Sequence, residues 1–307
     1  MPQARSTTPA ATRHPGWGRH RRWLPILLAW VFVLELAAAA AVPARLERER
    51  SAAHAQLVVP THPVLSAPAP PMVVGDRAVR LIGLGGPASN RLLSRVASNM
   101  GWAVEAVEAF WGRDWSRVIS VVVAGSDDQF RDAAGGGTEA QWADIAAVTV
   151  ADHADPANRV VLGQRIVFAP GAANMSEAAL RIVLTHELFH YAARADTALD
   201  APRWLTEGVA DFVARPSTPK PPDALDIALT MPTDADLDTP GPQRSLAYDR
   251  AWWFARFVAD AYGKAKLRAF YLAACGVGHA DLDRALRDAL GTDYGGAFAR
   301  WKEWMLH

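Results

Sequence analysis

The segment from Ser176 to Arg194 places two histidines and a glutamate in an otherwise apolar helical sequence. It reads SEAALRIVLTHELFHYAAR, with apolar residues on more than one face, which predicts a helix over 176–193 that is buried on several sides. His186, Glu187 and His190 would then enter the interior, where polar and charged groups without partners cost free energy. The fold must supply partners for them, and a bound cation is the partner that the pattern favours.

His186 and His190 are separated by four residues, so on a helix both imidazoles lie on one face, a single turn apart. At this spacing both nitrogens can reach one Zn²⁺ at bond lengths of about 2.0–2.1 Å. Glu187 follows the first histidine and can point at a water activated by the metal rather than at the metal itself. The HExxH arrangement therefore predicts two zinc ligands and a catalytic base that takes a proton from water.

A second helix, expected over 203–214, carries two acids on one face. Its sequence, WLTEGVADF, places Glu207 and Asp211 four residues apart among apolar neighbours, and we expect Asp200 to be its N-cap. If this helix packs against the first, Glu207 completes a three-ligand site and leaves the fourth position open for water. The alternative is that both acids lie on a solvated edge.

HELFH followed by WLTEGVADF resembles the gluzincin metallopeptidases, and the small bacterial gluzincin-like domains of the peptidase MA superfamily in particular. The resemblance covers roughly residues 115–305. It implies that Zn²⁺ is bound by His186, His190 and Glu207, that Glu187 is the base, and that a small sheet lies above the active-site helix. Two departures from the zinc aminopeptidases argue against aminopeptidase activity. The interval from His190 to Glu207 is shorter, and no segment before the motif matches their amine-binding segment.

Two further residues are candidates near the metal. Asp211 lies one turn beyond Glu207 and can accept the proton on the outer nitrogen of a ligand histidine. The resemblance indicates His186 as that histidine, and the alternative is an aspartate on the helix surface. Tyr248 begins an aromatic helix, and its phenol can donate to the oxyanion of a tetrahedral intermediate. The alternative for Tyr248 is a tyrosine of the core.

The N-terminal segments predict a membrane anchor. Residues 1–22 form a basic tail that includes Arg19, Arg21 and Arg22, and residues 23–42, WLPILLAWVFVLELAAAAAV, are long enough to cross a bilayer. Basic residues before the span predict a single-pass protein with a cytoplasmic N-terminus and an extracytoplasmic catalytic domain. Residues 43–75 are a Pro-rich linker. Cleavage of 23–42 as a signal peptide, which would release a secreted protein, is the alternative.

The rest of the chain, residues 76–307, is expected to form one α+β domain, because a strand-rich half precedes a helical half. The sequence predicts strands at 79–84, 117–124, 146–151 and 158–169, helices at 88–112, 127–133, 176–193, 203–214, 245–262, 264–274, 279–290 and 293–305, and loops at 216–222 and 232–242. The helical C-terminal half thus follows a small mixed sheet packed on the HExxH helix.

Composition narrows the function classes. The chain has 307 residues, with 32 Lys and Arg against 32 Asp and Glu, so nothing indicates nucleic acid as a partner. Cys275 is the only cysteine, which excludes an intramolecular disulfide and a cysteine-based zinc site. Together with the HExxH motif and the N-terminal span, the resemblance to the gluzincins implies a membrane-anchored, zinc-dependent peptidase that acts on a peptide or protein substrate. The alternative is a non-catalytic binding or scaffolding domain that a metal stabilises.

Overall fold

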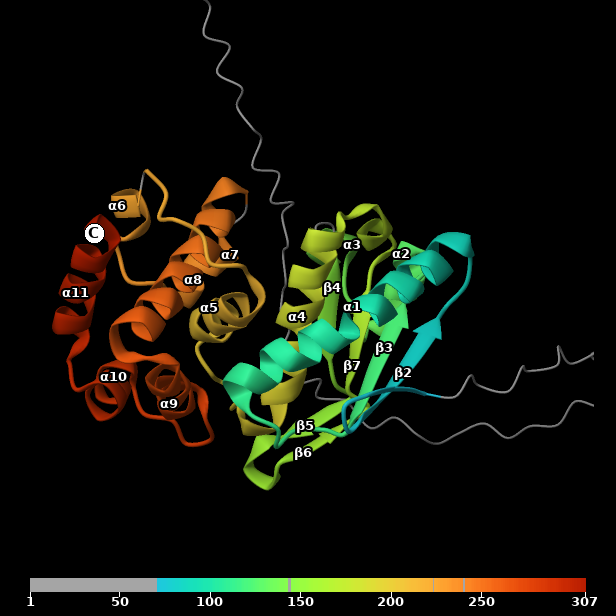
Figure 1. Cartoon of the computed structure of the whole chain (residues 1–307), viewed down its shortest axis with the longest axis horizontal. Coiled ribbons are helices and arrows are strands. Elements are labelled where there is room, and N and C mark those ends of the chain that lie inside the picture. The colour runs from blue at the N-terminus through green and yellow to red at the C-terminus, as the bar shows by residue number, and fades with distance from the viewer. Residues whose placement is uncertain (1–70, 143–144, 223, 240) are drawn as a thin grey trace, which may run out of the picture.

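The computed structural model describes residues 71–307, apart from 143–144, 223 and 240. These residues form a mixed α+β fold, with a sheet and its covering helices in one half and a group of helices in the other (Figure 1). The prediction of a small mixed sheet followed by a helical C-terminal half is confirmed. In the described part of the chain, no helix is both long and apolar enough to cross a membrane. The predicted tail and anchor, residues 1–22 and 23–42, lie outside that part.

The main sheet has five strands. In order across the sheet they are β1 (Met72–Val74), β2 (Arg77–Gly83), β3 (Val118–Val123), β7 (Arg165–Phe168) and β4 (Ala147–Val150). The three central strands are parallel to one another, while β1 and β4 are antiparallel edge strands. The sequence predicts residues 72–74 as the end of the linker, but they form β1 and belong to the sheet.

The single strand predicted over 158–169 is wrong. The chain turns at Gly163, whose φ of +64° lies in the left-handed region that glycine tolerates best. As a result β6 (Val160–Leu162) pairs with β5 (His153–Asp155) in a separate two-stranded sheet, and β7 alone joins the main sheet. Because strand-forming apolar residues lie on both sides of Gly163, the sequence pattern does not distinguish two short strands from one long strand.

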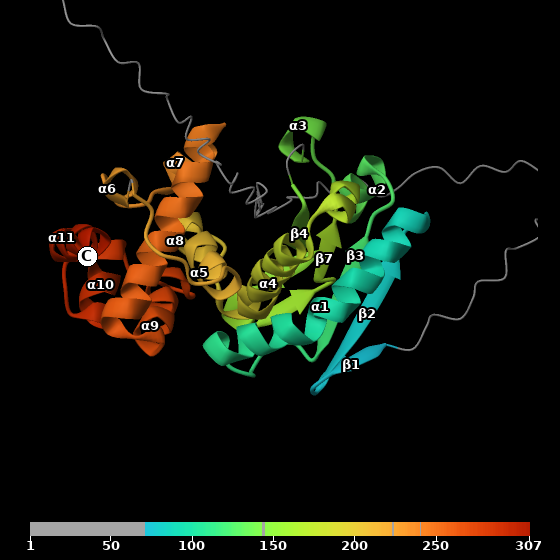
Figure 2. The same cartoon turned by 45° about the horizontal axis from the view of Figure 1, so that its top comes forward.

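Two long helices cover one face of the main sheet. α1 (Pro87–Trp111) contacts β2 and β3, and α4 (Glu177–Ala193) contacts β4 and β7 (Figure 2). Alternate strand residues, such as Val79, Ile119 and Val121, are fully buried beneath these helices. The shorter helices α2 (Asp127–Ala133) and α3 (Glu139–Trp142) lie near one end of the sheet, and single 3₁₀ turns occur at η1 (Pro156–Asn158), η2 (Pro170–Asn174) and η3 (Arg194–Asp196).

α4 begins with a side-chain cap and then runs through the interior. The hydroxyl of Ser176 accepts a hydrogen bond from the backbone N–H of Ala179 at 3.2 Å, and Glu177 favours the positive end of the helix dipole. Every residue from Val183 to Ala193 is buried, because α1, α5 and the sheet all contact this helix. The predicted burial on several sides is confirmed.

The helical half is built around α5 and α8. Its helices are α5 (Arg203–Ala214), α6 (Ala224–Ile227), α7 (Asp234–Asp238), α8 (Pro242–Tyr262), α9 (Lys264–Cys275), α10 (Leu282–Leu290) and α11 (Tyr294–Leu306). α5 packs against α4 on one side and α8 on the other, and thus joins the two halves. α7 occupies part of the segment that the sequence predicted as a loop at 232–242.

The N-terminus of α5 differs from the expectation. Asp200 does not cap it, and the N-cap residue, Pro202, makes no side-chain hydrogen bond. Instead the carboxylate of Asp234 accepts from the backbone N–H groups of Arg203 at 3.1 Å and Trp204 at 2.8 Å. The cap comes from a residue about thirty positions further along the chain, which a local capping rule does not consider.

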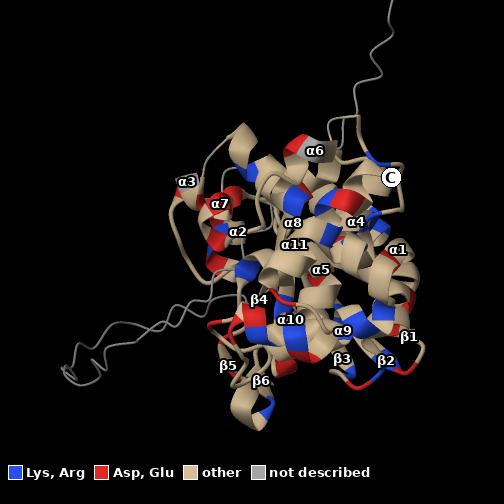
Figure 3. Ribbon diagram, turned by 90° about the vertical axis from the view of Figure 1, so that its left-hand side faces the viewer, with Lys and Arg blue, Asp and Glu red and all other residues tan. Residues whose placement is uncertain are grey.

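Charged residues of both signs are interspersed over the helical half, as Figure 3 shows. On α10, Arg287 pairs with Asp283 and Arg284 lies 3.5 Å from Asp288, each pair four residues apart. Such exposed pairs contribute little to stability but keep the helix surface solvated. The balance of signs agrees with the zero net charge of the chain.

Candidate metal centre

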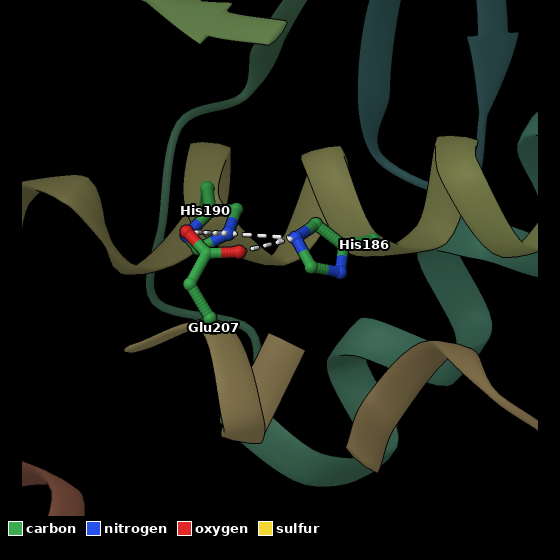
Figure 4. Close-up of side chains that lie close together, drawn as sticks. All are labelled: His186, His190 and Glu207. Atoms are coloured by element: carbon green, nitrogen blue, oxygen red, sulfur yellow. Dashed lines mark hydrogen bonds and ion pairs between the residues drawn. The ribbon is translucent and has the colours of Figure 1, made fainter. Parts of the chain in front are cut away.

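Three buried side chains from two helices converge where α4 meets α5 (Figure 4). His186 Nε2 lies 3.2 Å from Glu207 Oε2, and His190 Nε2 lies 3.6 Å from Glu207 Oε1. The two Nε2 atoms are 3.0 Å apart, and one ligand atom from each of the three residues lies within 4.8 Å of the others. The predicted position of Glu207, next to both histidines of the HExxH motif, is confirmed.

The electrostatics of this group favour positive charge. Burial lowers the pKa of His186, but its hydrogen bonds to Asp211 and Glu207 outweigh that effect and raise the pKa to about 10. Burial raises the pKa of Glu207, but the two histidines outweigh it and lower the pKa to about 2. A proton on His186 supplies positive charge in the metal-free chain, and a metal cation can take its place.

The donor set also fits a metal ion. Two imidazole nitrogens and a carboxylate oxygen are ligand types that transition metals such as zinc bind. All three side chains are at most 3 % exposed, so the protein rather than solvent determines where their ligand atoms lie. The group formed by His186, His190 and Glu207 can therefore hold a metal ion.

Glu187 lies beside this group with one carboxylate oxygen available. Its side chain is fully buried, and Thr149 Oγ1 lies 2.8 Å from both Oε2 and the backbone carbonyl oxygen of Glu187. Oε1 has no hydrogen-bond partner among the described residues. Burial raises the pKa of Glu187, against the charges of His186 and His190, which lower it. A buried carboxylate with a raised pKa and a free oxygen is suited to accept a proton.

The sequence did not indicate Thr149, although the sheet register explains its position. Thr149 on β4 pairs with Ile166 on β7, which pairs with Val121 on β3. Paired residues point to the same face, and for these three it is the face that α4 covers. A threonine at this register therefore meets Glu187, but its neighbours in the sequence carry no such information.

Asp211 lies beside the outer ring nitrogen of His186, one of the candidate ligands. Its Oδ1 is 2.9 Å from His186 Nδ1, and the residue is only 3 % exposed. The predicted contact with His186 is confirmed, and the alternative of a surface aspartate is wrong. The other oxygen, Oδ2, forms an ion pair with Arg215, which the sequence interpretation did not include. Arg215 follows Asp211 by four residues, a spacing that can signal such a pair.

Tyr248 on α8 is buried and close enough for the charges of the centre to affect it. Burial raises its pKa well above the ordinary value, and the negative charges of Glu207 and Asp211 raise it further. Its hydroxyl therefore stays protonated and can act as a hydrogen-bond donor. Its predicted catalytic role stays a prediction.

No protein-family model matches this chain, and no curated protein sequence matches it. The interpretation of the centre therefore depends on its own geometry and chemistry.

Proposed function

We propose that this chain is a zinc-dependent peptidase of the gluzincin type. In this proposal His186, His190 and Glu207 bind Zn²⁺, and Glu187 is the catalytic base. The observation that carries it is the unpaired Oε1 of Glu187, a buried carboxylate oxygen beside two imidazoles and a carboxylate whose ligand atoms converge. A purely structural metal site has no use for such a base, so the arrangement favours catalysis over scaffolding.

Each residue has a defined part in peptide hydrolysis. A zinc ion bound here would act as a Lewis acid toward the scissile carbonyl and lower the pKa of water. Glu187 Oε1 accepts a proton from the attacking water and passes it to the leaving amine, while Thr149 holds Oε2 in place. Tyr248 donates a hydrogen bond to the carbonyl oxygen as negative charge develops on it. Asp211 fixes the ring of His186.

The test combines metal analysis with a cleavage assay. The purified full chain should contain about one zinc ion per molecule. It should cleave members of a peptide library, lose that activity when a chelator removes the metal, and regain it when zinc is restored. Stoichiometric zinc without cleavage of any peptide would support the alternative, a non-catalytic domain that the metal stabilises. Cleavage that survives complete metal removal would contradict the proposal.

We further propose that residues 23–42 anchor the enzyme in the lipid bilayer, with the N-terminus in the cytoplasm and residues 76–307 on the other side. The basic residues Arg19, Arg21 and Arg22 support this orientation. A reporter enzyme that requires export should be active when fused after residue 75. Activity only from a cytoplasmic reporter at the same site would contradict the proposed topology, and a mature N-terminus near Arg45 would favour the secreted alternative.

A further inference from the structure

The carboxylate of Asp211 connects the metal centre to a partly buried arginine, Arg215. Arg215 Nη2 lies 2.6 Å from Asp211 Oδ2, and the backbone N–H of Arg215 donates to the carbonyl oxygen of Asp211 at 2.8 Å. The opposite carboxylate oxygen, Oδ1, is 2.9 Å from His186 Nδ1. Asp211 is thus held at both oxygens, by a ligand histidine on one side and by Arg215 on the other.

Arg215 is itself fixed by two further contacts. Its Nη1 donates to Asp249 Oδ1 at 2.8 Å, and its guanidinium carbon lies 4.9 Å from the ring centroid of Trp252. Both residues belong to α8, and the Arg215 side chain is only 15 % exposed. A planar guanidinium can bond two carboxylates and stack on an aromatic face at once, whereas a lysine ammonium is a compact point charge whose three donors lack this planar geometry.

We propose that Arg215, oriented by Asp249 and Trp252, is a positioning residue for the metal centre. It prevents rotation of the Asp211 carboxylate, so that Oδ1 stays on His186 Nδ1 and His186 presents Nε2 toward Glu207 and His190. The terminal torsion of an aspartate is otherwise broad, and a carboxylate bonded at one oxygen alone can turn away. This inference rests on the proposed function only in requiring that the centre binds a metal.

The main test is the zinc affinity of the full chain carrying Arg215→Met, measured by competition with a chelating indicator. Methionine keeps an apolar stem against Trp252 and removes the guanidinium. We expect affinity to fall about tenfold, as for other residues that orient metal ligands. The absorption spectrum of bound Co²⁺ should also change, because the geometry at His186 relaxes. Arg215→Lys should bind zinc more tightly than Arg215→Met but more weakly than the wild-type chain.

Arg256 provides a matched control. Its side chain is 16 % exposed and its guanidinium carbon lies 4.9 Å from the ring centroid of Trp253, almost the environment of Arg215. However, it bonds Ser217 and Thr218 rather than any residue of the metal centre. Arg256→Met should therefore leave zinc affinity and the Co²⁺ spectrum unchanged. An equal loss of affinity in both variants would overturn the proposal, because it would reflect general loosening of the fold.

A double-mutant cycle shows whether Arg215 acts through Asp211. Arg215→Met should weaken zinc binding in the wild-type chain but add little in a chain that already carries Asp211→Asn. If Arg215→Met does not fold, Asp249→Asn replaces it in the cycle. Asp249 orients Arg215, and its side chain is 45 % exposed, so the fold should tolerate the substitution. Additive losses, or wild-type affinity in the single variant, would overturn the inference alone. A wild-type chain that binds no metal would overturn the proposed function as well.

Discussion

Asp211 and His186 are joined by a contact of 2.9 Å between Oδ1 of the carboxylate and Nδ1 of the imidazole. This contact determines which nitrogen of His186 can bind a metal. The Nδ1 proton is donated to Asp211, so Nε2, which faces Glu207 and His190, is the nitrogen that can bind a metal once its own proton leaves. The orientation of the first candidate ligand, His186, therefore depends on an acid from the neighbouring helix.

We expect Asp211→Asn to weaken zinc affinity about 10–100-fold without unfolding the protein. Asparagine keeps the shape of the side chain and can still accept from Nδ1, but it lacks the negative charge that strengthens the bond. Chelator competition measures the affinity, and circular dichroism checks the fold. Asp288→Asn on the exposed surface of α10 is the control. Wild-type affinity in Asp211→Asn would contradict the assignment.

Glu187→Gln should reduce the rate of peptide hydrolysis about 10²-fold or more, because the amide cannot accept a proton. Zinc content should stay near one per molecule, since Glu187 is assigned to water rather than to the metal. Steady-state kinetics and metal analysis of the same preparation measure both quantities. A variant that retains more than about a tenth of the wild-type rate would show that Glu187 is not the base.

The positions of the candidate ligands could be predicted from sequence because the relevant geometry is local. The spacing of His186 and His190, and that of Glu207 and Asp211, defines one helix face in each case, whatever surrounds the helix. The apolar pattern around them then requires the two faces to be buried together. The contacts among these residues agree with that expectation.

Other parts of the site depend on tertiary pairing, and the local sequence did not reveal them. Thr149 contacts Glu187 because of the register in which β4 pairs with β7. Asp234 caps α5 from α7, a helix that is distant in sequence but packs against α5. A local capping rule selected Asp200 instead, because it assumes that the cap immediately precedes the helix. Arg215 differs from Thr149 and Asp234, because its pairing with Asp211 is local and follows from their four-residue spacing in the sequence.

Tyr248→Phe distinguishes the two interpretations of this tyrosine. If the hydroxyl stabilises the oxyanion, kcat should fall about 10²-fold while KM stays nearly constant. If Tyr248 is a core residue only, kcat should be kept and the effect should be a lower free energy of unfolding. Measuring kinetics and denaturant unfolding on the same variant separates these outcomes. A kcat within a few-fold of wild type would contradict the catalytic role.

The metal-free chain should lose stability as the pH rises above the ordinary range of histidine. The pKa of His186 is raised from 6.5 to about 10, so its stabilising contribution is complete below pH 6.5 and is lost as the pH approaches 10. The pKa of Glu207 is lowered from 4.5 to about 2, so its contribution is complete above pH 4.5 and is lost toward pH 2. Denaturant unfolding should therefore give a greater free energy at about pH 5.5 than at about pH 9. A stability that increases from about pH 5.5 to about pH 9 would contradict the expected linkage.

The same protonation predicts that zinc binding at neutral pH should release about one proton, which calorimetry in two buffers can measure.

Gly208 sets the distance between α5 and α8, and replacing it tests how tightly the centre depends on that packing. A Cβ at Gly208 would lie 2.5 Å from the carbonyl oxygen of Ala251, an atom of the α8 backbone that cannot move alone. We expect Gly208→Ala to lower the free energy of unfolding by about 1–3 kcal/mol, because the helices must separate.

Gly101→Ala on α1 is the matched control, because its Cβ would meet nothing within 4 Å. There the higher helix propensity of alanine should raise the free energy of unfolding by up to about 1 kcal/mol. Because Gly208 adjoins Glu207, the shift of α5 in Gly208→Ala should also weaken zinc binding, whereas Gly101→Ala should not. Equal stability and equal zinc affinity in the two variants would mean that the close approach of α5 to α8 does not position the third ligand.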